Sequence, residues 1–434
     1  MGGVPRPHLP EKGEMRIQNR FLSLFAGALA GLACAASQAR ATPFIVLDAA
    51  SGRVVLEQES THRWYPASLT KLMTLYVALT AVREKRVTLD TPIVVSMRAA
   101  RMPASKMGFN PGSEVTLDNA MKMLMVKSAN DIAVTIAEGL GGSVEGFADQ
   151  MNAAAARLGM NESHFVNPNG LHNDNHYSSA RDMAIVGRAL YRDFPEFADY
   201  YGIGALRLGP QIIPTHNGLL GRYPGADGMK TGFTCPAGFN VVASATRGGR
   251  RLIVVVLGYP NAKARTLKTA SLLDGGFASG SGSTPIAGLP AVQGAAPNMR
   301  PRVCGAHRDQ VAEDDFAVPV VKPGEGDHAA AFFAHSGAGV PASNVAAVQE
   351  QLHTRPSFEP VDVYVGRAPG WTGPVLAARG DAPRPEASAA APSAPKVKGK
   401  HAAKGRKAAK KKLAPKAKAE SKPTPPARPR TAQH

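Results

Sequence analysis

The sequence of 434 residues contains little cysteine and no long hydrophobic run. Three cysteines are too few for the disulfide framework of a small secreted scaffold. His172 and His176 are four residues apart, as zinc ligands on a helix would be. The Asn and Asp residues between them disfavour a helix, no third ligand is obvious, and we expect solvated loop histidines. The sequence therefore indicates neither a disulfide scaffold nor a metal or cofactor site.

An apolar run near the N-terminus, residues 21–36, follows two arginines and precedes the small-x-small pattern Ala39-Arg40-Ala41. The run is too short and too rich in Ala and Gly for a membrane span. Together these features predict a cleaved export signal, with Met15 as a plausible start. Cys34 leaves a lipoprotein as a less favoured alternative. We expect residues 1–41 to be a signal peptide and the mature protein to be exported to the periplasm or cell envelope.

Acidic residues are also few, 33 against 51 lysines and arginines, and the imbalance is greatest at the C-terminal end. Residues 396–434 contain fourteen Lys or Arg and one Glu, so thirteen of the eighteen net positive charges lie there. We expect this stretch to be a disordered polycation. Residues 281–395 are dense in Ala, Pro and Gly, with one strand-like run at 361–365, and should be mostly disordered. The folded domain is therefore predicted to be residues 42–280.

Within that domain, residues 66–82 are apolar nearly all round and predict a buried helix. Pro66 suits its first turn because proline needs no backbone donor there. Ser68 and Lys71, three residues apart, should lie on one face and within reach of each other. A serine beside an amine at a helix N-terminus has what a nucleophile needs. Taken alone, the pair is more often a helix cap and a lysine that extends to solvent.

The remaining pattern predicts a mixed α/β domain. Apolar runs on either side of Ser51-Gly52 predict one β-hairpin, and two longer runs joined through Gly248-Gly249 predict another. Helices are expected over residues 117–125, 131–139, 143–158, 182–191 and 262–277, with Thr116 and Ser143 as caps. The predicted arrangement is an antiparallel sheet flanked by helices, with a helical insert over roughly residues 113–220.

Two further polar motifs occur in this domain. Ser128-Ala129-Asn130 forms a short break between two apolar helices, and Lys230-Thr231-Gly232 lies on a strand beside the second hairpin. Each is weak alone, since a serine and an asparagine two residues apart are usually a loop and a cap. Together with Ser-x-x-Lys, and in this order, they are the motifs of penicillin-binding proteins and class A β-lactamases.

Longer strings make this resemblance more specific. They cover residues 66–74, 128–131, 165–171, 176–183 and 227–234. Over about residues 42–280 the chain resembles the exported D-alanyl-D-alanine carboxypeptidases, the low-molecular-weight penicillin-binding proteins of serine peptidase family S11. The resemblance implies an α/β fold of the β-lactamase/transpeptidase type.

The resemblance also implies roles for the motif residues. Ser68 would be the nucleophile and Lys71 its base. Burial and the like charge of Lys230 would keep Lys71 neutral. Ser128 would pass the proton to the leaving nitrogen. The amides of Ser68 and Phe233 would form the oxyanion hole. The substrate-binding residues would be Asn130, Lys230, Thr231, Gly232, Phe233 and Arg265. For Arg265, the alternative to substrate binding is an ordinary ion pair on a surface helix.

The implied activity is removal of the terminal D-alanine from peptidoglycan stem pentapeptides, without a cofactor. The chain has no Glu-x-x-Leu-Asn between Asn130 and Lys230, the element that class A β-lactamases use for deacylation, so β-lactams should inhibit more than they serve as substrates. The alternatives are a DD-endopeptidase and a catalytically weak wall-binding or penicillin-binding protein. The export signal disfavours nucleic acid as a partner of the basic tail, which should instead contact an anionic wall or membrane surface.

The C-terminal half departs from the pattern of many relatives, which carry a β-rich second domain and a terminal amphipathic helix on the membrane. Neither is readable in this sequence. Cys235 follows the Lys-Thr-Gly strand, and Cys304 lies in the next region. The exported compartment would permit a disulfide between them, but unpaired cysteines are the favoured interpretation.

Overall fold

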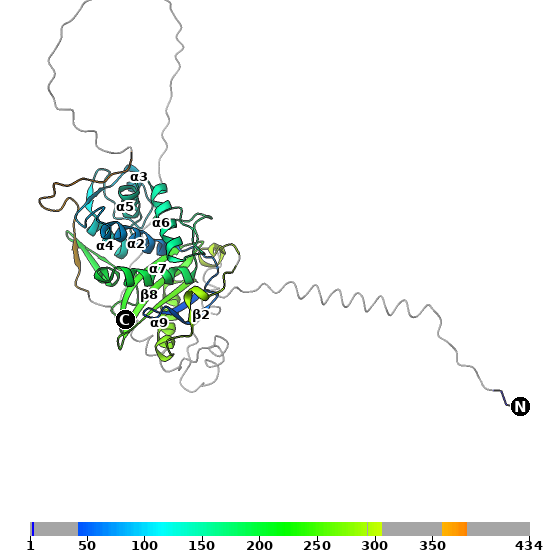
Figure 1. The fold of residues 1–434 in the computed structure, drawn as a ribbon. Helices are drawn as coiled ribbons and strands as arrows, with labels where there is room; N and C mark the ends of the chain where they lie inside the picture. Colours follow the sequence, from blue (N-terminus) through cyan, green and yellow to red (C-terminus); the bar gives the residue numbers. More distant parts are fainter. Residues whose placement is uncertain (1, 4–41, 293, 306–357, 380–434) are drawn as a thin grey trace, which may run out of the picture. The chain divides into compact units, whose positions relative to one another are not determined.

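The computed structural model describes residues 2–3, 42–292, 294–305 and 358–379. Apart from residues 2–3, the predicted signal peptide lies outside these ranges, as does the basic tail, so both stay predictions. Figure 1 shows the described chain as a sheet with helices against it. Within the described residues, no helix combines the length and the apolar character needed to cross a membrane.

The main sheet is antiparallel, with its strands in the order β10–β2–β1–β9–β8–β7. Its strands are β1 (Phe44–Asp48), β2 (Arg53–Gln58), β7 (Ala226–Thr234), β8 (Gly238–Arg247), β9 (Arg250–Tyr259) and β10 (Thr284–Pro285). Both predicted hairpins are confirmed, since β1 pairs with β2 and β8 with β9. The pairing of β1 with β9 joins the two hairpins, so the N-terminal strand lies beside strands from the end of the domain.

Both faces of this sheet are buried. Ile45 and Leu47 of β1 lie in one hydrophobic core, together with residues of the helices from α2 to α7. Phe44 and Val46 point to the opposite face and lie in a second core, with α9 (Ala262–Ala278). Figure 1 shows α7 and α9 on opposite sides of the strands. Successive side chains of a strand alternate between faces, so two buried faces require the continuous apolar runs seen in the sequence.

The first core is covered by a helical region. Its helices are α2 (Lys71–Arg83), α3 (Met97–Ala100), α4 (Leu117–Val126), α5 (Asn130–Gly141), α6 (Val144–Leu158), α7 (Ala180–Asp193) and α8 (Asp199–Gly202), with a short 3₁₀ turn, η2 (Pro195–Phe197). The predicted caps are confirmed, because the hydroxyls of Thr116 and Ser143 accept hydrogen bonds from backbone amides of the first turns. Short strands complete the region: β3 (Pro92–Val94) pairs with β4 (Glu114–Thr116), and β5 (Ala205–Leu208) with β6 (Gln211–Pro214). The pair β5–β6 was not predicted.

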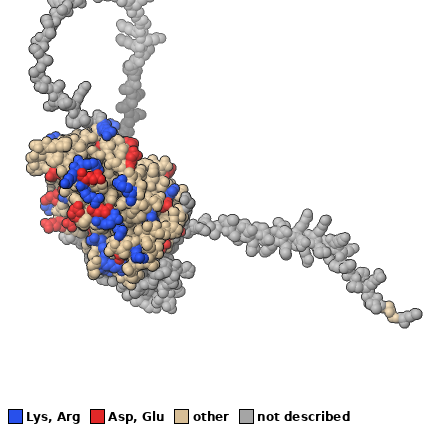
Figure 2. All heavy atoms as spheres, in the orientation of Figure 1, with Lys and Arg blue, Asp and Glu red and all other residues tan. Residues whose placement is uncertain are grey.

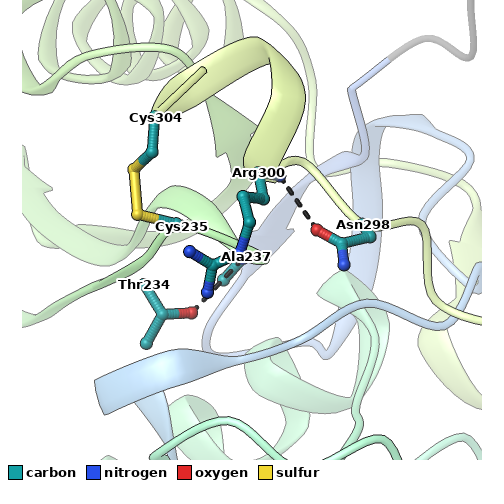
Figure 3. Close-up of a disulfide and its surroundings, with 6 residues drawn as sticks. All are labelled: Thr234, Cys235, Ala237, Asn298, Arg300 and Cys304. Atoms are coloured by element: carbon teal, nitrogen blue, oxygen red, sulfur yellow. Dashed lines mark hydrogen bonds between the residues drawn. A yellow bond between two sulfur atoms is a disulfide. The ribbon is translucent and has the colours of Figure 1, made fainter. Parts of the chain in front are cut away.

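Ordered structure continues past the predicted domain boundary at Gly280. β10 pairs with β2, and it is followed by η3 (Ile286–Gly288) and α10 (Arg300–Val303). Cys304, at the end of α10, forms a disulfide with Cys235 (Cα–Cα distance 5.7 Å; Figure 3). The interpretation of these two cysteines as unpaired is therefore wrong. Their separation of 69 residues gave no local signal of the contact.

A further segment, residues 358–379, lies against the helical region. Its strand β11 (Val361–Val363), inside the predicted strand-like run, pairs in parallel with β5. Farther on, the amide of Leu376 donates to the Pro92 carbonyl and its carbonyl accepts from the Val94 amide, both at 2.9 Å. Residues 281–395 were predicted to be mostly disordered apart from this run, and the ordered segment extends beyond the run because the open edges of two short strands supply its backbone partners.

Candidate active site

Ser68 lies in a short 3₁₀ helix, η1 (Ala67–Thr70), which leads directly into α2. The sequence predicted a single helix from Pro66, and the structure divides it into these two parts. Ala67 has a φ of 49°, in the left-handed region that non-glycine residues rarely adopt. The backbone therefore turns sharply just before the serine, and Lys71 becomes the first residue of α2.

The Lys71 amine is completely buried and lies among three oxygen atoms. Its Nζ is 2.9 Å from Ser68 Oγ, 2.8 Å from Asn130 Oδ1 and 2.7 Å from the backbone oxygen of Asn169. A neutral amine in this position can donate to two of these oxygens and accept a proton from the third, the serine hydroxyl. The predicted pair of Ser68 and Lys71 is thus in direct contact.

Three basic side chains are buried close to one another here. Burial, and then the positive charge of Lys230, move the pKa of Lys71 well below its ordinary value, while Asp131 opposes the shift. Burial and the charge of Arg265 lower the pKa of Lys230 to about 7. Burial lowers the pKa of Arg265 to about 10. So much positive charge with so little compensation favours an anionic ligand.

Arg265, on α9, does not form the ordinary surface ion pair that was the alternative. Its side chain is 5% exposed, and no carboxylate in the described ranges forms a salt bridge with it. Nη1 donates to the backbone oxygen of Asn240 at 3.4 Å, and Nε has no hydrogen-bond partner among the described residues. A buried guanidinium with an unused donor is suited to binding an anion.

Asn130 is the first residue of α5 and is fixed by both ends of its amide. Its Oδ1 accepts from Lys71, and its Nδ2 donates to the Pro103 carbonyl at 3.0 Å. Ser128, two residues earlier, is 7% exposed and has a φ of 60°. In the described part of the chain, no hydrogen bond joins its hydroxyl to Ser68 or Lys71. The structure therefore connects Asn130 directly to the base, and Ser128 only through the short turn.

Lys230, Thr231 and Gly232 lie on β7, the strand at one end of the main sheet, as the sequence predicted. A Cβ at Gly232 would lie 2.9 Å from the Pro66 oxygen and 3.1 Å from the Ser68 amide nitrogen. Glycine thus allows the strand to lie directly against the turn that carries the serine. Phe233 follows, 43% exposed, with its ring 4.2 Å from that of Phe239.

The sequence interpretation missed Asn169, whose backbone oxygen binds Lys71. The next residue, Gly170, has a φ of 80°, and a Cβ there would lie 1.8 Å from the Ala67 oxygen. Asn167 Oδ1 accepts from the Gly170 amide at 2.7 Å and holds the turn in shape. The signal for this site was the sequence Asn-Pro-Asn-Gly, which is rich in turn-forming residues.

His176 connects the same loop to the serine turn. Its Nδ1 accepts from the Val166 amide at 3.1 Å, so Nε2 carries the proton that it shares with Thr70 Oγ1 at 2.8 Å. Burial, with nearby positive groups, lowers the pKa of His176 to about 3, so the ring is neutral. The expectation of a solvated histidine is wrong for His176. No group of side chains in the described ranges is arranged to hold a metal ion.

Asn240, in the middle of β8, is a second residue that the sequence interpretation missed. Its Nδ2 donates to the backbone oxygens of Tyr65 (2.9 Å) and Pro66 (3.2 Å), and its Oδ1 accepts from the Gly258 amide at 2.8 Å. The side chain is fully buried and fixes the backbone just before Ser68. An asparagine inside an otherwise apolar strand was the available signal, because a buried amide must find partners.

The disulfide holds another segment beside this turn. Cys235 comes directly after β7, and the Met299 amide donates to the Pro236 oxygen at 2.9 Å. Ala296 packs against a small cluster that contains Tyr65 and Ala67. Figure 3 shows α10 lying over the end of β7. The chain after Gly280 thus supports the backbone next to the serine.

Comparison with known proteins shows which proteins this chain is similar to. D-alanyl-D-alanine carboxypeptidase DacA of Haemophilus influenzae is 37% identical over 246 residues, which cover 56% of this chain and 63% of that protein. The solved structure of penicillin binding protein 5 from the same species is 37% identical, with a TM-score of 0.53 and coverage of 56% and 72%. Penicillin-Binding Protein D2 from Listeria monocytogenes, in an ampicillin-bound form, is 28% identical, with a TM-score of 0.50 and coverage of 56% and 99%.

The chain thus spans less than two thirds of the length of the curated relative. Residues 31–261 match the family described as D-alanyl-D-alanine carboxypeptidase. This range is more than half of the chain and contains the Ser68, Asn130 and Lys230 motifs, while Arg265 lies just beyond it. The solved relatives share the antiparallel sheet and flanking helices of the β-lactamase-like penicillin-binding fold. The chain belongs to the D-alanyl-D-alanine carboxypeptidase family.

Proposed function

We propose that the chain is an exported serine-type D-Ala-D-Ala carboxypeptidase, which removes the terminal D-alanine from peptidoglycan stem pentapeptides. One observation carries the proposal: Ser68 Oγ lies 2.9 Å from the amine of a completely buried Lys71. A free serine hydroxyl is a poor nucleophile, and a neutral amine at hydrogen-bond distance is the base that activates it.

In acylation, Lys71 Nζ takes the proton from Ser68 Oγ as this oxygen attacks the carbonyl carbon of the penultimate residue. The amides of Ser68 and Phe233 stabilise the oxyanion, as the family resemblance implies. Lys71 passes this proton to Ser128 while Ser128 gives its own proton to the departing nitrogen, so the C–N bond breaks, free D-alanine leaves and Lys71 is neutral again. Water then attacks the Ser68 ester and loses a proton to Lys71. That proton returns to Ser68 Oγ as the shortened peptide is released.

The outer edge of β7 supports the proposed mode of substrate binding. β7 is the last strand of the main sheet, so an extended peptide can pair with it as an added strand. The terminal carboxylate of the substrate would then meet Lys230, Thr231 and Arg265. The buried positive charge and the unused Arg265 Nε supply the attraction that an α-carboxylate needs.

β-Lactams are proposed to acylate the same serine and to inhibit the enzyme. The Listeria monocytogenes relative has been solved in an ampicillin-bound form. This chain has no Glu-x-x-Leu-Asn element between Asn130 and Lys230 to activate a deacylating water. A penicilloyl group on Ser68 should therefore leave slowly.

The test uses purified full-length protein, a synthetic pentapeptide ending in D-Ala-D-Ala and a fluorescent penicillin. Wild-type protein should release D-alanine and be labelled at Ser68, as located by peptide mass mapping. Ser68→Ala should do neither while it melts at the wild-type temperature. Labelling of Ser68→Ala would exclude the assignment. Labelled wild-type protein without D-alanine release would instead indicate a penicillin-binding protein without turnover, and preferential cleavage of cross-linked peptides would indicate an endopeptidase.

We also propose that residues 396–434 hold the enzyme near an anionic wall or membrane surface, without contact to nucleic acid. This stretch carries thirteen net positive charges, whereas the face of the folded domain in Figure 2 shows basic and acidic side chains side by side. Sedimentation with isolated sacculi or anionic vesicles would compare full-length protein with a version ending at Pro395. Binding of the full chain should exceed that of the shorter one at low salt and weaken at about 0.15 M, where the Debye length is ~8 Å. Equal binding of both at low salt would exclude this role.

A further inference from the structure

A cavity of about 340 Å³ lies between the C-terminal end of α6, one face of α7 and η3. Its lining shares no residue with the proposed active site. It is therefore a separate feature of the domain, which the proposed reaction does not use, although one lining residue, Arg181, lies in the family-like string 176–183.

Four arginines line this cavity: Arg157 from the last turn of α6, and Arg181, Arg188 and Arg192 from α7. The three on α7 are seven and four residues apart, so they project from one face of the helix. None of the described residues that line the cavity is acidic. Like charges one turn apart repel each other and destabilise a helix. The stability of α7 therefore does not explain why three arginines share this face.

Two of the guanidinium groups are fixed in place largely by backbone oxygens. Arg188 Nε donates to the Ala49 oxygen at 2.7 Å, at the turn between β1 and β2. Arg181 Nε donates to the Ile286 oxygen at 3.1 Å, and its Nη1 pairs with the buried Asp182. Carbonyl groups orient a guanidinium without cancelling its charge, so Arg188 stays a positioned cation.

The other two arginines lie exposed at the rim. Arg192 pairs with Asp193 at 2.6 Å, and within the described residues no carboxylate forms a salt bridge with Arg157. The four guanidinium groups are thus paired with only two carboxylates, those of Asp182 and Asp193, and the cavity keeps a net positive charge. Leu158 and Ile185 add apolar surface to its wall, which strengthens electrostatic attraction by excluding water.

We propose that this cavity is a second binding site, for a phosphate group. Several guanidinium groups around one cavity match a tetrahedral oxyanion, because its oxygens can accept paired hydrogen bonds from more than one arginine. The apolar wall would contact the carbon skeleton that bears the phosphate. For an exported protein, phosphorylated glycans and lipid headgroups both present this chemistry.

The first experiment titrates full-length protein with inorganic phosphate at constant ionic strength, using calorimetry. The double variant Arg157→Gln/Arg192→Gln removes the two exposed guanidinium groups at the rim. Arg86→Gln/Arg207→Gln is the matched control, since it removes two exposed, ion-paired arginines elsewhere. Wild-type and control proteins should bind phosphate saturably with similar affinity, and the rim variant at least tenfold more weakly. Penicillin labelling should be the same in all three, which separates this site from the proposed catalytic one.

A second experiment distinguishes the sources of the phosphate. The three proteins are tested with phosphatidylcholine vesicles with and without phosphatidylglycerol, and with a phosphorylated hexosamine. All three carry the basic tail, so a difference between them arises from the cavity. Weaker binding of the rim variant than of the control to phosphatidylglycerol vesicles would indicate a lipid headgroup, and weaker binding to the phosphorylated sugar would indicate a glycan. No saturable phosphate binding by wild-type protein, or equal affinity of the rim variant and the control, would overturn the proposal.

Discussion

The surroundings of Ser68 and the two late segments of the chain, residues 294–305 and 358–379, are stabilised in different ways. Around the serine, buried side chains such as Lys71 and Asn240 form hydrogen bonds with partners from several elements. The late segments are attached by one disulfide and by backbone pairing at the edges of short strands. The first arrangement fixes the positions of individual side chains, while the second mainly fixes the path of the chain.

This difference has an energetic consequence. When a buried polar group loses its hydrogen-bond partner, the free energy of unfolding falls by about 1–3 kcal/mol, and neighbouring groups shift to find new partners. Changes near Ser68 should therefore reduce acylation before they unfold the domain. A disulfide acts mainly by restricting the unfolded chain, so its loss should reduce stability before it reduces acylation.

The largest effect is expected for Lys71→Arg. Arginine keeps the charge but does not lose its proton near neutral pH, so it cannot accept the proton of Ser68. Acylation by a fluorescent penicillin should fall by about 10²–10⁴-fold, the range for loss of a general base. Lys122→Arg, at a helix position that pairs with Asp118, is the matched control and should acylate normally. An acylation rate near wild type for Lys71→Arg would show that another group is the base.

Gly170→Ala tests the geometry around the serine without changing a charge. The added Cβ would lie 1.8 Å from the Ala67 oxygen, at a φ of 80°, and would push the Asn169 carbonyl away from Lys71. We expect acylation to fall at least tenfold, with a loss of about 1–3 kcal/mol in stability. Gly248→Ala is the control, since its φ is also positive but nothing lies within 4 Å of the added atom. Equal behaviour of the two variants would contradict the role of this contact.

The pH dependence of kcat/KM for the pentapeptide separates the two lysines. Lys71 must be neutral to accept a proton, so its contribution rises with pH. Lys230, with a pKa of about 7, is charged below that pH and neutral above it, so attraction of the substrate carboxylate declines as pH rises through 7. The profile should therefore pass through a maximum, because kcat/KM reports the groups of the free enzyme. Lys230→Gln should lower kcat/KM on the acidic side of the profile and remove its decline near pH 7. If kcat/KM of this variant still declines near pH 7, a group other than Lys230 causes the decline.

Removal of the disulfide should affect mainly stability. Cys304→Ser opens a loop of 69 residues, and the free energy of unfolding should fall by about 2–4 kcal/mol. Acylation of the folded protein should change less than in Gly170→Ala, because Ser68 keeps its side-chain partners. Denaturant unfolding and penicillin labelling of Cys304→Ser, Cys235→Ser and reduced wild-type protein would measure both quantities. If the disulfide variants lost acylation without losing stability, the disulfide would act on the active site and not mainly on the unfolded chain, contrary to the expected difference between the two regions.

The smallest effect is expected at the segment 358–379. Arg367 pairs with Glu114, but its guanidinium is exposed and the ion pair is screened by solvent. Arg367→Gln should leave the melting temperature and the acylation rate within experimental error. A clear fall in melting temperature would show that the segment depends on this side chain more than on its backbone pairing.

Much of the fold and of the site was predictable because it depends on neighbours in the sequence. Ser68 and Lys71 are three residues apart, so the start of one helix brings them together. The caps at Thr116 and Ser143 follow from a side chain and an amide within the same turn. Apolar runs bounded by turn residues predicted both hairpins. The order of the three motifs, together with the longer strings, then identified the family.

Tertiary structure alone decided which distant groups meet. The Asn169 oxygen reaches Lys71 across 98 positions, and the Asn240 amide reaches the Pro66 oxygen across 174. The pairing of β1 with β9 brings the two ends of the domain together, and no local pattern specifies that partner. The disulfide and the burial of His176 have the same origin. Propensity and spacing act over a few residues, whereas these contacts depend on how the whole sheet and its helices pack.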